Sequence, residues 1–251
     1  MVKLENIKFQ IKDKIILDDV SVNFEKSKLN IVLGPNGSGK STLIKIISKE
    51  IIPNNGNVIY ENQNLDLISI SELSTYRAVL SQNIEVAFPL SVSEIILMGR
   101  YPHFKNKPNK IDFEICENAL NLFDLTNFKN RNYLSLSGGE KQRVQFARVF
   151  AQIWLSITQK PRLLLLDEPL TFLDIYYQYD LMDKIKLFMK NNSDLTVIGI
   201  VHDLNIASKY ADTLTFIKNG KIYKQGLTKE ILTEQNIFNV FNINVKNNFI
   251  I

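Results

Sequence analysis

The sequence predicts an α/β fold: a mostly parallel sheet covered by helices, with an N-terminal antiparallel β-subdomain and a helical insertion. Three observations predict it. Apolar runs alternate along the chain with segments whose apolar residues recur at helical spacing, as in parallel strands joined by helices. A glycine-rich turn separates one such run from a helical segment. Residues 84–135 have the composition of helices and a loop rather than of more sheet.

The first elements form a strand pair followed by a strand, a turn and a helix. Residues 2–11 and 16–24 alternate around a turn at Lys12–Lys14, which predicts two short strands. Residues 29–33 are an apolar run that stops at Gly34-Pro35, which is typical of a buried strand, and residues 41–50 have helical spacing. A turn at Pro53–Gly56 precedes a strand near 57–60.

The later elements are an insertion and a second strand–helix alternation. Helical stretches at 91–100 and 110–125 flank a loop with Pro102 and Pro108. A helix at 138–154, a strand at 162–167, a helix at 175–190 and a strand at 196–201 follow, and the tail from 226 is helical in pattern. We therefore expect a single domain over 1–251, with a core plus β-subdomain at about 1–82 and 136–225, a helical subdomain at about 83–135 and a C-terminal extension at about 226–251.

Composition excludes several classes of protein. The 251 residues are 45% hydrophobic and 22% charged, which is ordinary for a globular chain. The single Cys116 excludes an internal disulfide and a multi-cysteine metal site. No apolar run reaches the roughly 18 residues of a membrane span, and the N-terminus lacks a secretory pattern. The net charge of +4 comes from scattered lysines, which indicates a solvated surface rather than a nucleic-acid site.

The glycine-rich turn carries the strongest chemical signal, the phosphate-binding pattern G-x-x-x-x-G-K-[ST]. Its glycines let backbone N–H groups approach phosphate oxygens, and the helix that follows adds its positive end. Lys40 supplies a cation for the β- and γ-phosphates, and Ser41 supplies a hydroxyl for Mg²⁺. A P-loop NTPase fold follows, with this phosphate loop as the ATP-binding segment: Gly34, Pro35, Asn36, Gly37, Ser38, Gly39, Lys40, Ser41 and Thr42.

Polar residues that follow apolar runs are the candidates for the reaction itself. Asp167 and Glu168 end the run 163–166; they suit Mg²⁺ coordination and the polarisation of an attacking water. His202 follows the run 196–201 and is by itself more often structural than catalytic. Gln82 has an amide for Mg²⁺ or water, and the residues alone leave its role open.

A second segment joins serine and glycine at the start of a helix: Leu136, Ser137, Gly138, Gly139 and Glu140. It is either another anion-binding helix end or a simple helix cap by Ser137.

Together these motifs resemble the ATP-binding subunits of ABC transporters over nearly the whole chain. The resemblance implies that 136–140 is the signature segment, 34–42 the Walker A loop, and 163–168 the Walker B strand with Glu168 as the catalytic glutamate. It also implies a Q-loop at Gln82, a D-loop at Leu173-Asp174 and a switch histidine at His202. Mg²⁺ would be held by Ser41, Gln82 and Asp167.

The same resemblance implies a head-to-tail homodimer with ATP between the phosphate loop of one chain and Ser137–Gly139 of the other. The chain departs from the family at three places. Ile11 stands where the family has an aromatic residue that stacks on adenine, with Phe9 nearby. Ser27 replaces a turn glycine, and Pro169-Leu170-Thr171 replaces the commoner Pro-Thr-Ser.

Within the family, the segments 78–83, 87–103 and 147–154 resemble the ATPases of haem (hemin) importers, which belong to the group importing iron chelates and vitamin B12. A ferric siderophore or cobalamin importer is the alternative, and an ABC ATPase that acts on ribosomes or DNA is the rival class. We expect ATP and Mg²⁺ as ligands and a peripheral position on the cytoplasmic face of the inner membrane. The expected partners are permease subunits docked near 98–103 and, indirectly, a periplasmic or surface substrate-binding protein. We expect no nucleic-acid partner and no direct haem binding by His103.

Overall fold

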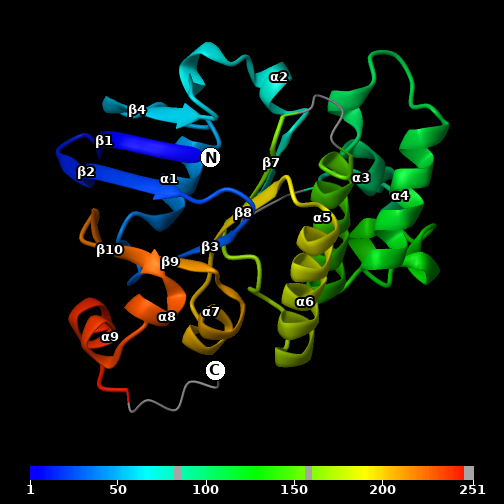
Figure 1. Ribbon diagram of the computed structural model, residues 1–251. Coiled ribbons are helices and arrows are strands. Elements are labelled where there is room, and N and C mark those ends of the chain that lie inside the picture. The colour runs from blue at the N-terminus through cyan, green and yellow to red at the C-terminus, as the bar shows by residue number, and fades with distance from the viewer. Residues whose placement is uncertain (82–85, 156–159, 246–251) are drawn as a thin grey trace.

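The structure is a computed structural model that describes residues 1–81, 86–155 and 160–245. Two sheets and a group of helices build it (Figure 1). The strands are β1 Val2–Ile11, β2 Lys14–Phe24, β3 Leu29–Leu33, β4 Asn55–Tyr60, β5 Gln63–Asn64, β6 Arg77–Leu80, β7 Arg162–Leu166, β8 Leu195–Ile200, β9 Thr213–Lys218 and β10 Lys221–Leu227.

The α-helices are α1 Lys40–Ile47, α2 Ile70–Leu73, α3 Val92–Met98, α4 Lys110–Leu122, α5 Gly138–Gln152, α6 Ile175–Asn191, α7 Leu204–Tyr210, α8 Thr228–Ile231 and α9 Glu234–Phe241. Short 3-10 turns lie at η1 Leu65–Leu67, η2 Tyr101–His103, η3 Thr126–Phe128 and η4 Tyr133–Ser135.

The larger sheet has the strand order β10-β9-β3-β8-β7-β6. Neighbouring strands from β9 to β6 are parallel, and only β10 pairs antiparallel, with β9. Parallel strands bring their carboxyl ends to one edge of the sheet, where ligands bind in α/β folds. The ends of β3, β7 and β8 are therefore where a site is expected.

The smaller sheet has the order β2-β1-β4-β5 and is antiparallel throughout. Strand β2 begins at Lys14, so the turn that precedes it is shorter than the sequence pattern indicates. This sheet lies over the opposite face of the core from the insertion helices α3 and α4 (Figure 1).

Two hydrophobic clusters occupy the two faces of the larger sheet, and strand β7 serves both. Leu163 and Leu165 pack into the cluster shared with the smaller sheet and α1, whereas Leu164 and Leu166 pack into the cluster formed with α3 to α7. A continuous apolar run is thus required, because both faces of this strand are covered. The insertion helices α3 and α4 contact α5 and stand on one side of the molecule in Figure 1.

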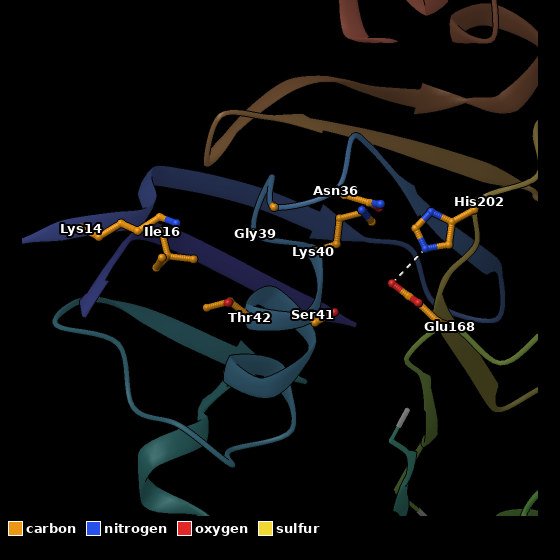
Figure 2. Close-up of a pocket in the computed structure, with 10 residues that line it drawn as sticks. Lys14, Ile16, Asn36, Gly39, Lys40, Ser41, Thr42, Glu168 and His202 are labelled. Carbon is orange, nitrogen blue, oxygen red and sulfur yellow. Dashed lines mark ion pairs between the residues drawn. The ribbon is translucent and has the colours of Figure 1, made fainter. Parts of the chain in front are cut away.

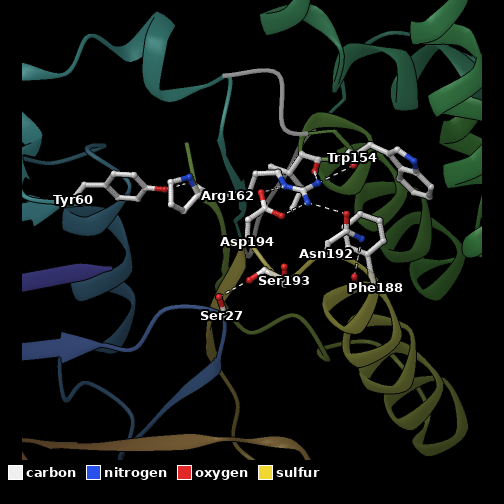
Figure 3. Close-up of polar contacts among 10 residues, drawn as sticks. Ser27, Tyr60, Trp154, Arg162, Phe188, Asn192, Ser193 and Asp194 are labelled. Carbon is white, nitrogen blue, oxygen red and sulfur yellow. Dashed lines mark hydrogen bonds and ion pairs between the residues drawn. The ribbon is translucent and has the colours of Figure 1, made fainter. Parts of the chain in front are cut away.

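Arg162, at the start of β7, forms hydrogen bonds to the segments that follow α5 and α6 (Figure 3). Its guanidinium donates to both carboxylate oxygens of Asp194, to the side chain of Asn192 and to the carbonyls of Ile153 and Trp154 at the end of α5. The arginine therefore fixes the ends of α5 and α6 beside the first residue of β7.

Ser27 explains one departure from the family pattern. It adopts a left-handed backbone with φ of 58°, which favours glycine. Its hydroxyl donates to the carbonyl of Ser193 at 2.5 Å (Figure 3). Its N–H donates to the hydroxyl of Thr196 at 2.8 Å. These two hydrogen bonds offset the backbone cost of a serine at this turn.

The predicted elements are present with boundaries shifted by a few residues, and the sequence analysis missed β5, β6, β9, β10, α2 and α7. The tail contains the helices α8 and α9, as its pattern indicates. Among the described residues, no helix combines the length and the apolar character that a membrane span requires.

Candidate functional site

The phosphate loop connects β3 to α1, and its glycines are required by geometry. Gly39 caps α1 with φ of 102°, a conformation that side chains rarely adopt. A Cβ atom on Gly34 would lie 2.1 Å from the carbonyl oxygen of Ile217. Gly34 is thus packed against β9, and a Cβ atom on Gly39 would lie 2.6 Å from Leu17 Cδ2, so neither position has room for a side chain.

Lys40 is the first residue of α1 and is buried. Its ammonium donates to the carbonyls of Gly34 at 2.9 Å and Pro35 at 3.0 Å, so it lies within the curve of the loop. Burial lowers the pKa of Lys40, and the negative charges of Glu168 and Asp167 oppose that shift. A cation held in a partly desolvated loop attracts phosphate oxygens more strongly than one in water.

Ser41 and Asp167 meet at the carboxyl end of β7. The serine hydroxyl donates to the Asp167 carboxylate at 2.9 Å. Burial raises the pKa of Asp167, and the hydrogen bond from Ser41 opposes that rise. A hydroxyl beside a carboxylate is a donor set that suits Mg²⁺, which binds oxygen ligands and keeps several waters. These two residues therefore fit a magnesium ion shared with nucleotide phosphates.

Glu168 and His202 face each other from two neighbouring strand ends. His202 Nε2 lies 2.8 Å from Glu168 Oε1 (Figure 2). Glu168 follows β7 with φ of 52°, a positive value that is uncommon for a residue with a side chain. The parallel register of β7 and β8 brings both residues to the same edge of the sheet.

These groups line one cavity of about 660 Å³ that runs along the phosphate loop (Figure 2). A second cavity of about 410 Å³ lies on the far side of Glu168 and His202 and also borders Thr171 and Gln178. The lining of the first cavity is Lys14, Ile16, Asn36, Gly37, Gly39, Lys40, Ser41, Thr42, Glu168 and His202.

The signature segment begins α5 and lies outside that cavity. Ser137 and Glu140 form a reciprocal capping box: the Ser137 hydroxyl accepts from the Glu140 N–H, and the Glu140 carboxylate accepts from the Ser137 N–H. This backbone hydrogen bond lowers the pKa of Glu140. The described lining of the cavity contains none of residues 136–140, so one chain does not bring its own signature segment to its phosphate loop.

The predicted D-loop, Leu173-Asp174, lies beside the predicted signature segment of the same chain. A Cβ atom on Gly139 would lie 3.7 Å from both Leu173 Cδ2 and the Phe172 carbonyl oxygen. Asp174 caps α6 by accepting from the Tyr177 N–H at 3.1 Å. Gln82 lies outside the described residues, so its predicted place at the site stays a prediction.

Sequence reasoning missed two residues of the cavity, Lys14 and Ile16. It pointed instead to Ile11, which is 57% exposed and is not part of the described lining. The difference arises because β2 begins at Lys14, immediately beyond the turn, and residues two apart in a strand face the same side. The alternating pattern of β2 could be recognised in the sequence. Its position over the phosphate loop could not.

His103 lies in the insertion and faces the end of α5. Its Nε2 is 2.6 Å from the carbonyl oxygen of Gln152. Beside it, Arg100 donates from Nε to Asp112 at 3.0 Å and from Nη1 to the Ala151 carbonyl at 2.7 Å. Burial lowers the pKa of His103, and the charge of Arg100 adds to that effect. Its position against the end of α5 therefore disfavours the protonated imidazole.

Comparison with known proteins defines the class to which this fold and site belong. The family profile of the ABC transporter matches residues 17–171, which include the phosphate loop and the Asp167–Glu168 pair. The chain therefore belongs to the ABC transporter family, as one of its ATP-binding proteins.

Within the ABC transporter family, the chain is similar to proteins named for hemin import. The chain is 36% identical to the hemin import ATP-binding protein HmuV of Pseudoalteromonas translucida, over 98% of this chain and 94% of that protein. It is 38% identical to the proteins of the same name from Escherichia coli O157:H7, covering 94% and 90%, and Agrobacterium fabrum, covering 97% and 92%.

Solved structures agree with the fold. The structure matches an inward-facing ABC transporter assigned to the metal-chelate type with a TM-score of 0.80 at 26% identity, over 97% of this chain and 89% of that one. It also matches a dimeric bacterial ABC transporter cassette with a TM-score of 0.78 at 25% identity, over 91% and 99%. The predicted P-loop NTPase fold, with its antiparallel sheet and helical insertion, is thus confirmed.

Proposed function

We propose that this protein is the ATP-hydrolysing subunit of an ABC importer that takes up haem across the inner membrane. The observation that carries the proposal is the cavity along the phosphate loop, which is lined by Lys40, Ser41 and the Glu168–His202 pair. Asp167 adjoins it through its hydrogen bond with Ser41. The similarity to hemin import ATP-binding proteins at 36% and 38% identity supports haem as the cargo.

The phosphates of ATP bind along the loop. Backbone N–H groups of residues 36–41 donate to their oxygens, and the start of α1 adds its positive end. Lys40 turns from the carbonyls of Gly34 and Pro35 to the phosphates, because an anionic acceptor is stronger than a neutral carbonyl. The lysine thus exchanges one set of hydrogen bonds for a better one when ATP binds.

A magnesium ion would be held by Ser41 and Asp167, with Gln82 as a further ligand. When bound, it neutralises phosphate charge. The existing contact of Ser41 with Asp167 keeps both oxygens at the place where this ion and the nucleotide meet.

Glu168 orients the attacking water and accepts its proton. The water oxygen forms a bond to the γ-phosphorus while the bond to the β–γ bridging oxygen breaks, so the products are ADP and phosphate. His202, now paired with Glu168, contacts the γ-phosphate once it is bound. His202 therefore connects the γ-phosphate to Glu168 when the phosphate is bound.

The site is completed by a second copy of the chain. Because the signature segment lies away from its own cavity, Ser137, Gly138 and Gly139 serve the ATP of the partner in a head-to-tail dimer. ATP then favours the closed dimer by binding across both chains, which is a population shift. This coupling of ATP hydrolysis to transport places the enzyme among the translocases.

The membrane partner docks on the insertion, at 83–110. Phe88 and Tyr101 are large apolar residues exposed on this part of the surface, and Tyr101 packs edge-on against Phe104. Exposed aromatic residues are typical of protein interfaces. The chain is held peripherally at the cytoplasmic face through permease subunits, and the substrate-binding protein acts on the other side. Haem does not contact this chain, which agrees with the engagement of His103 by Gln152.

The test is ATPase stimulation in a reconstituted transporter. The chain is combined with the membrane subunits of its transporter, and the ATPase rate is measured with binding protein that is empty, haem-loaded, siderophore-loaded or cobalamin-loaded. We expect haem-loaded protein alone to stimulate hydrolysis, with the Glu168→Gln complex giving the background rate. Stimulation by the siderophore-loaded or a cobalamin-loaded protein instead would overturn haem as the cargo.

The resemblance to a transporter of the metal-chelate type supports the alternative cargo, a ferric siderophore or cobalamin. The same reconstitution separates the two cargoes, because each loaded binding protein is tested on the same membrane subunits.

A further inference from the structure

Glu168, the residue proposed to accept the proton of the attacking water, stands in the turn that connects β7 to α6. Its backbone has φ of 52°, a value that is uncommon for a residue with a side chain. Such a conformation costs free energy and persists only where the surrounding contacts fix it. The contacts of this turn therefore decide where the Glu168 carboxylate points.

Two carbonyls of the turn are paired within the turn itself. The Glu168 carbonyl accepts from the Thr171 hydroxyl at 3.1 Å and from the Thr171 N–H at 3.4 Å. The Leu170 carbonyl accepts from the Leu173 N–H at 3.3 Å. N–H···O bonds in proteins are commonly about 2.7–3.2 Å long, so both backbone bonds of the turn are long. The turn is only loosely closed by its own atoms.

The carbonyl of Pro169, which follows Glu168 directly, is paired from another element. Gln142, in the second turn of α5, donates from its side-chain Nε2 to this oxygen at 2.8 Å. Pro169 is buried and Gln142 is half-buried, and a hydrogen bond shielded from water is electrostatically stronger than an exposed one. This bond is shorter than the three bonds within the turn, and it anchors the turn to α5.

The start of α5 lies against the other end of the same turn. A Cβ atom on Gly138 would lie 3.8 Å from Phe172 Cβ, and one on Gly139 would lie 3.7 Å from the Phe172 carbonyl oxygen. The first turn of α5 thus contacts the end of the segment whose beginning is held by Gln142. The turn of Glu168 is consequently joined to α5 at two places.

The position of Glu168 affects hydrolysis more than nucleotide binding. Its carboxylate lies 2.8 Å from His202 Nε2, whereas Lys40 and the phosphate loop, which hold the nucleotide, belong to a different part of the chain (Figure 2). A general base acts only within hydrogen-bond reach of the proton that it accepts. A displacement of about 1 Å can lower a rate about 100-fold. A change confined to this turn should therefore lower turnover and leave ATP binding intact.

We propose that Gln142 is a positioning residue for ATP hydrolysis: its amide holds the Pro169 carbonyl and thereby sets the direction of the Glu168 carboxylate. The inference rests on the proposed function, because it takes Glu168 as the group that accepts the proton. Gln142 is not among the described lining residues of either cavity at the site. It acts through the turn and does not touch the nucleotide.

The experiment measures turnover and ATP affinity in the full chain and in the variants Gln142→Met, Gln142→Lys and Gln152→Met. Methionine matches the unbranched shape and helix propensity of glutamine but has no hydrogen-bond donor. In Gln142→Met, kcat at saturating ATP and Mg²⁺ should fall at least about tenfold. The ATP affinity of this variant, measured by calorimetry, should stay within about twofold of that of the unaltered chain. Gln142→Lys keeps a donor on an unbranched side chain and should recover most of the rate.

The matched control is Gln152→Met, which makes the same change at the other end of α5, about 15 Å along the helix axis. The Gln152 amide donates to the carbonyls of Ser74 at 2.8 Å and Arg77 at 3.0 Å. This variant loses two hydrogen bonds, so its stability should fall at least as far as that of Gln142→Met. Its kcat should nevertheless stay within about twofold of the unaltered value.

Three results would overturn the proposal. The first is a kcat of Gln142→Met within about twofold of the unaltered value, or a loss in Gln152→Met of the same size as in Gln142→Met. The second is a parallel fall of ATP affinity and kcat in Gln142→Met, which would indicate a general distortion of the site. The third is a Gln142→Lys variant as slow as Gln142→Met, because the donor would then not matter.

Hydrogen exchange measured by mass spectrometry keeps this result distinct from the proposed function. Amide hydrogens of residues 168–173 should exchange faster in Gln142→Met than in the unaltered chain or in Gln152→Met, because α5 no longer opposes local opening of the turn. Faster exchange in a chain that hydrolyses no ATP supports the contact of Gln142 with the turn and contradicts the ATPase. Unaltered exchange overturns the proposal whether or not the chain hydrolyses ATP.

Discussion

The buried ion pair between Arg100 and Asp112 gives the sharpest prediction about stability. The two side chains are only 1% and 2% exposed and lie 3.0 Å apart. Arg100 also donates to the Ala151 carbonyl at the end of α5. The pair therefore ties the insertion to the helix that begins with the signature segment. The perturbation is Arg100→Met, which keeps most of the side-chain volume and removes the charge.

Two estimates of the unfolding free energy lost in Arg100→Met agree. Removing one partner of a buried pair leaves an uncompensated charge and costs about 3–5 kcal/mol. Counted instead as hydrogen bonds, the two bonds from the guanidinium contribute about 1.5–3 kcal/mol each. The second count gives about 3–6 kcal/mol in total, which agrees with a loss of about 3–5 kcal/mol. Such a loss is a large part of the roughly 5–15 kcal/mol that stabilises a typical protein.

The assay is urea unfolding of Arg100→Met, Asp112→Asn and the double variant. Each single variant should lose about 3–5 kcal/mol of unfolding free energy, and the double variant should lose about 2 kcal/mol less than their sum. The matched control is Lys110→Met, which breaks the ion pair between Lys110 and Glu114 on α4. The Lys110 side chain is 91% exposed. Such a surface pair contributes about 0–1 kcal/mol.

The reasoning is refuted if Arg100→Met costs no more than Lys110→Met. Strict additivity in the double variant would also refute it, because two residues that share one buried bond must show coupling.

Three further outcomes are expected. Lys40→Ala should weaken ATP binding, measured by calorimetry, by more than about tenfold, since a charge-assisted contact is lost. Lys45 is exposed on the same helix, and Lys45→Ala should bind ATP with unaltered affinity. Equal affinities of the two variants would contradict the phosphate-loop assignment. Glu168→Gln should retain ATP binding and accumulate a dimer in size-exclusion chromatography while phosphate release falls by at least about 100-fold; normal turnover would exclude Glu168 as the group that accepts the proton. Hydrogen bonds from Arg162 lower the pKa of Asp194 in the folded chain, so its contribution to stability is full above the unfolded pKa of about 4 and is lost as the pH falls through the folded value. Accordingly, the difference in unfolding free energy between the unaltered chain and Asp194→Asn should shrink below about pH 4, and a difference that grows with acidity would reverse the sign of this argument.

Much of the candidate site was predictable because its parts are local in sequence. The phosphate loop needs a strand, a glycine-rich turn and a helix in succession, and all three are encoded within residues 29–47. Asp167, Glu168 and His202 were identifiable because each follows an apolar run, and parallel strands end at one edge. Ser137 and Glu140 have the spacing of a capping box, which the structure contains.

The rest depended on contacts between residues far apart in the chain. Arg100 and Asp112 are on different elements, and Arg162 is separated from Asp194 by a whole helix. Pairing of that kind is set by how elements pack, and charge alone in a sequence does not reveal it. His103 has no partner that its neighbours in the sequence reveal, and only packing against α5 brings its Nε2 to a backbone carbonyl.

The sequence by itself determined the class of fold, the phosphate loop and the acidic pair, because these follow from periodicity and from spacing within short segments. The tertiary structure alone decided which residues of the smaller sheet line the cavity along the phosphate loop. Lys14 and Ile16 come to the cavity, and Ile11 does not, because of where the β1–β2 turn ends and how β2 lies across the loop. That placement results from the packing of two sheets on one core, to which residues throughout the chain contribute.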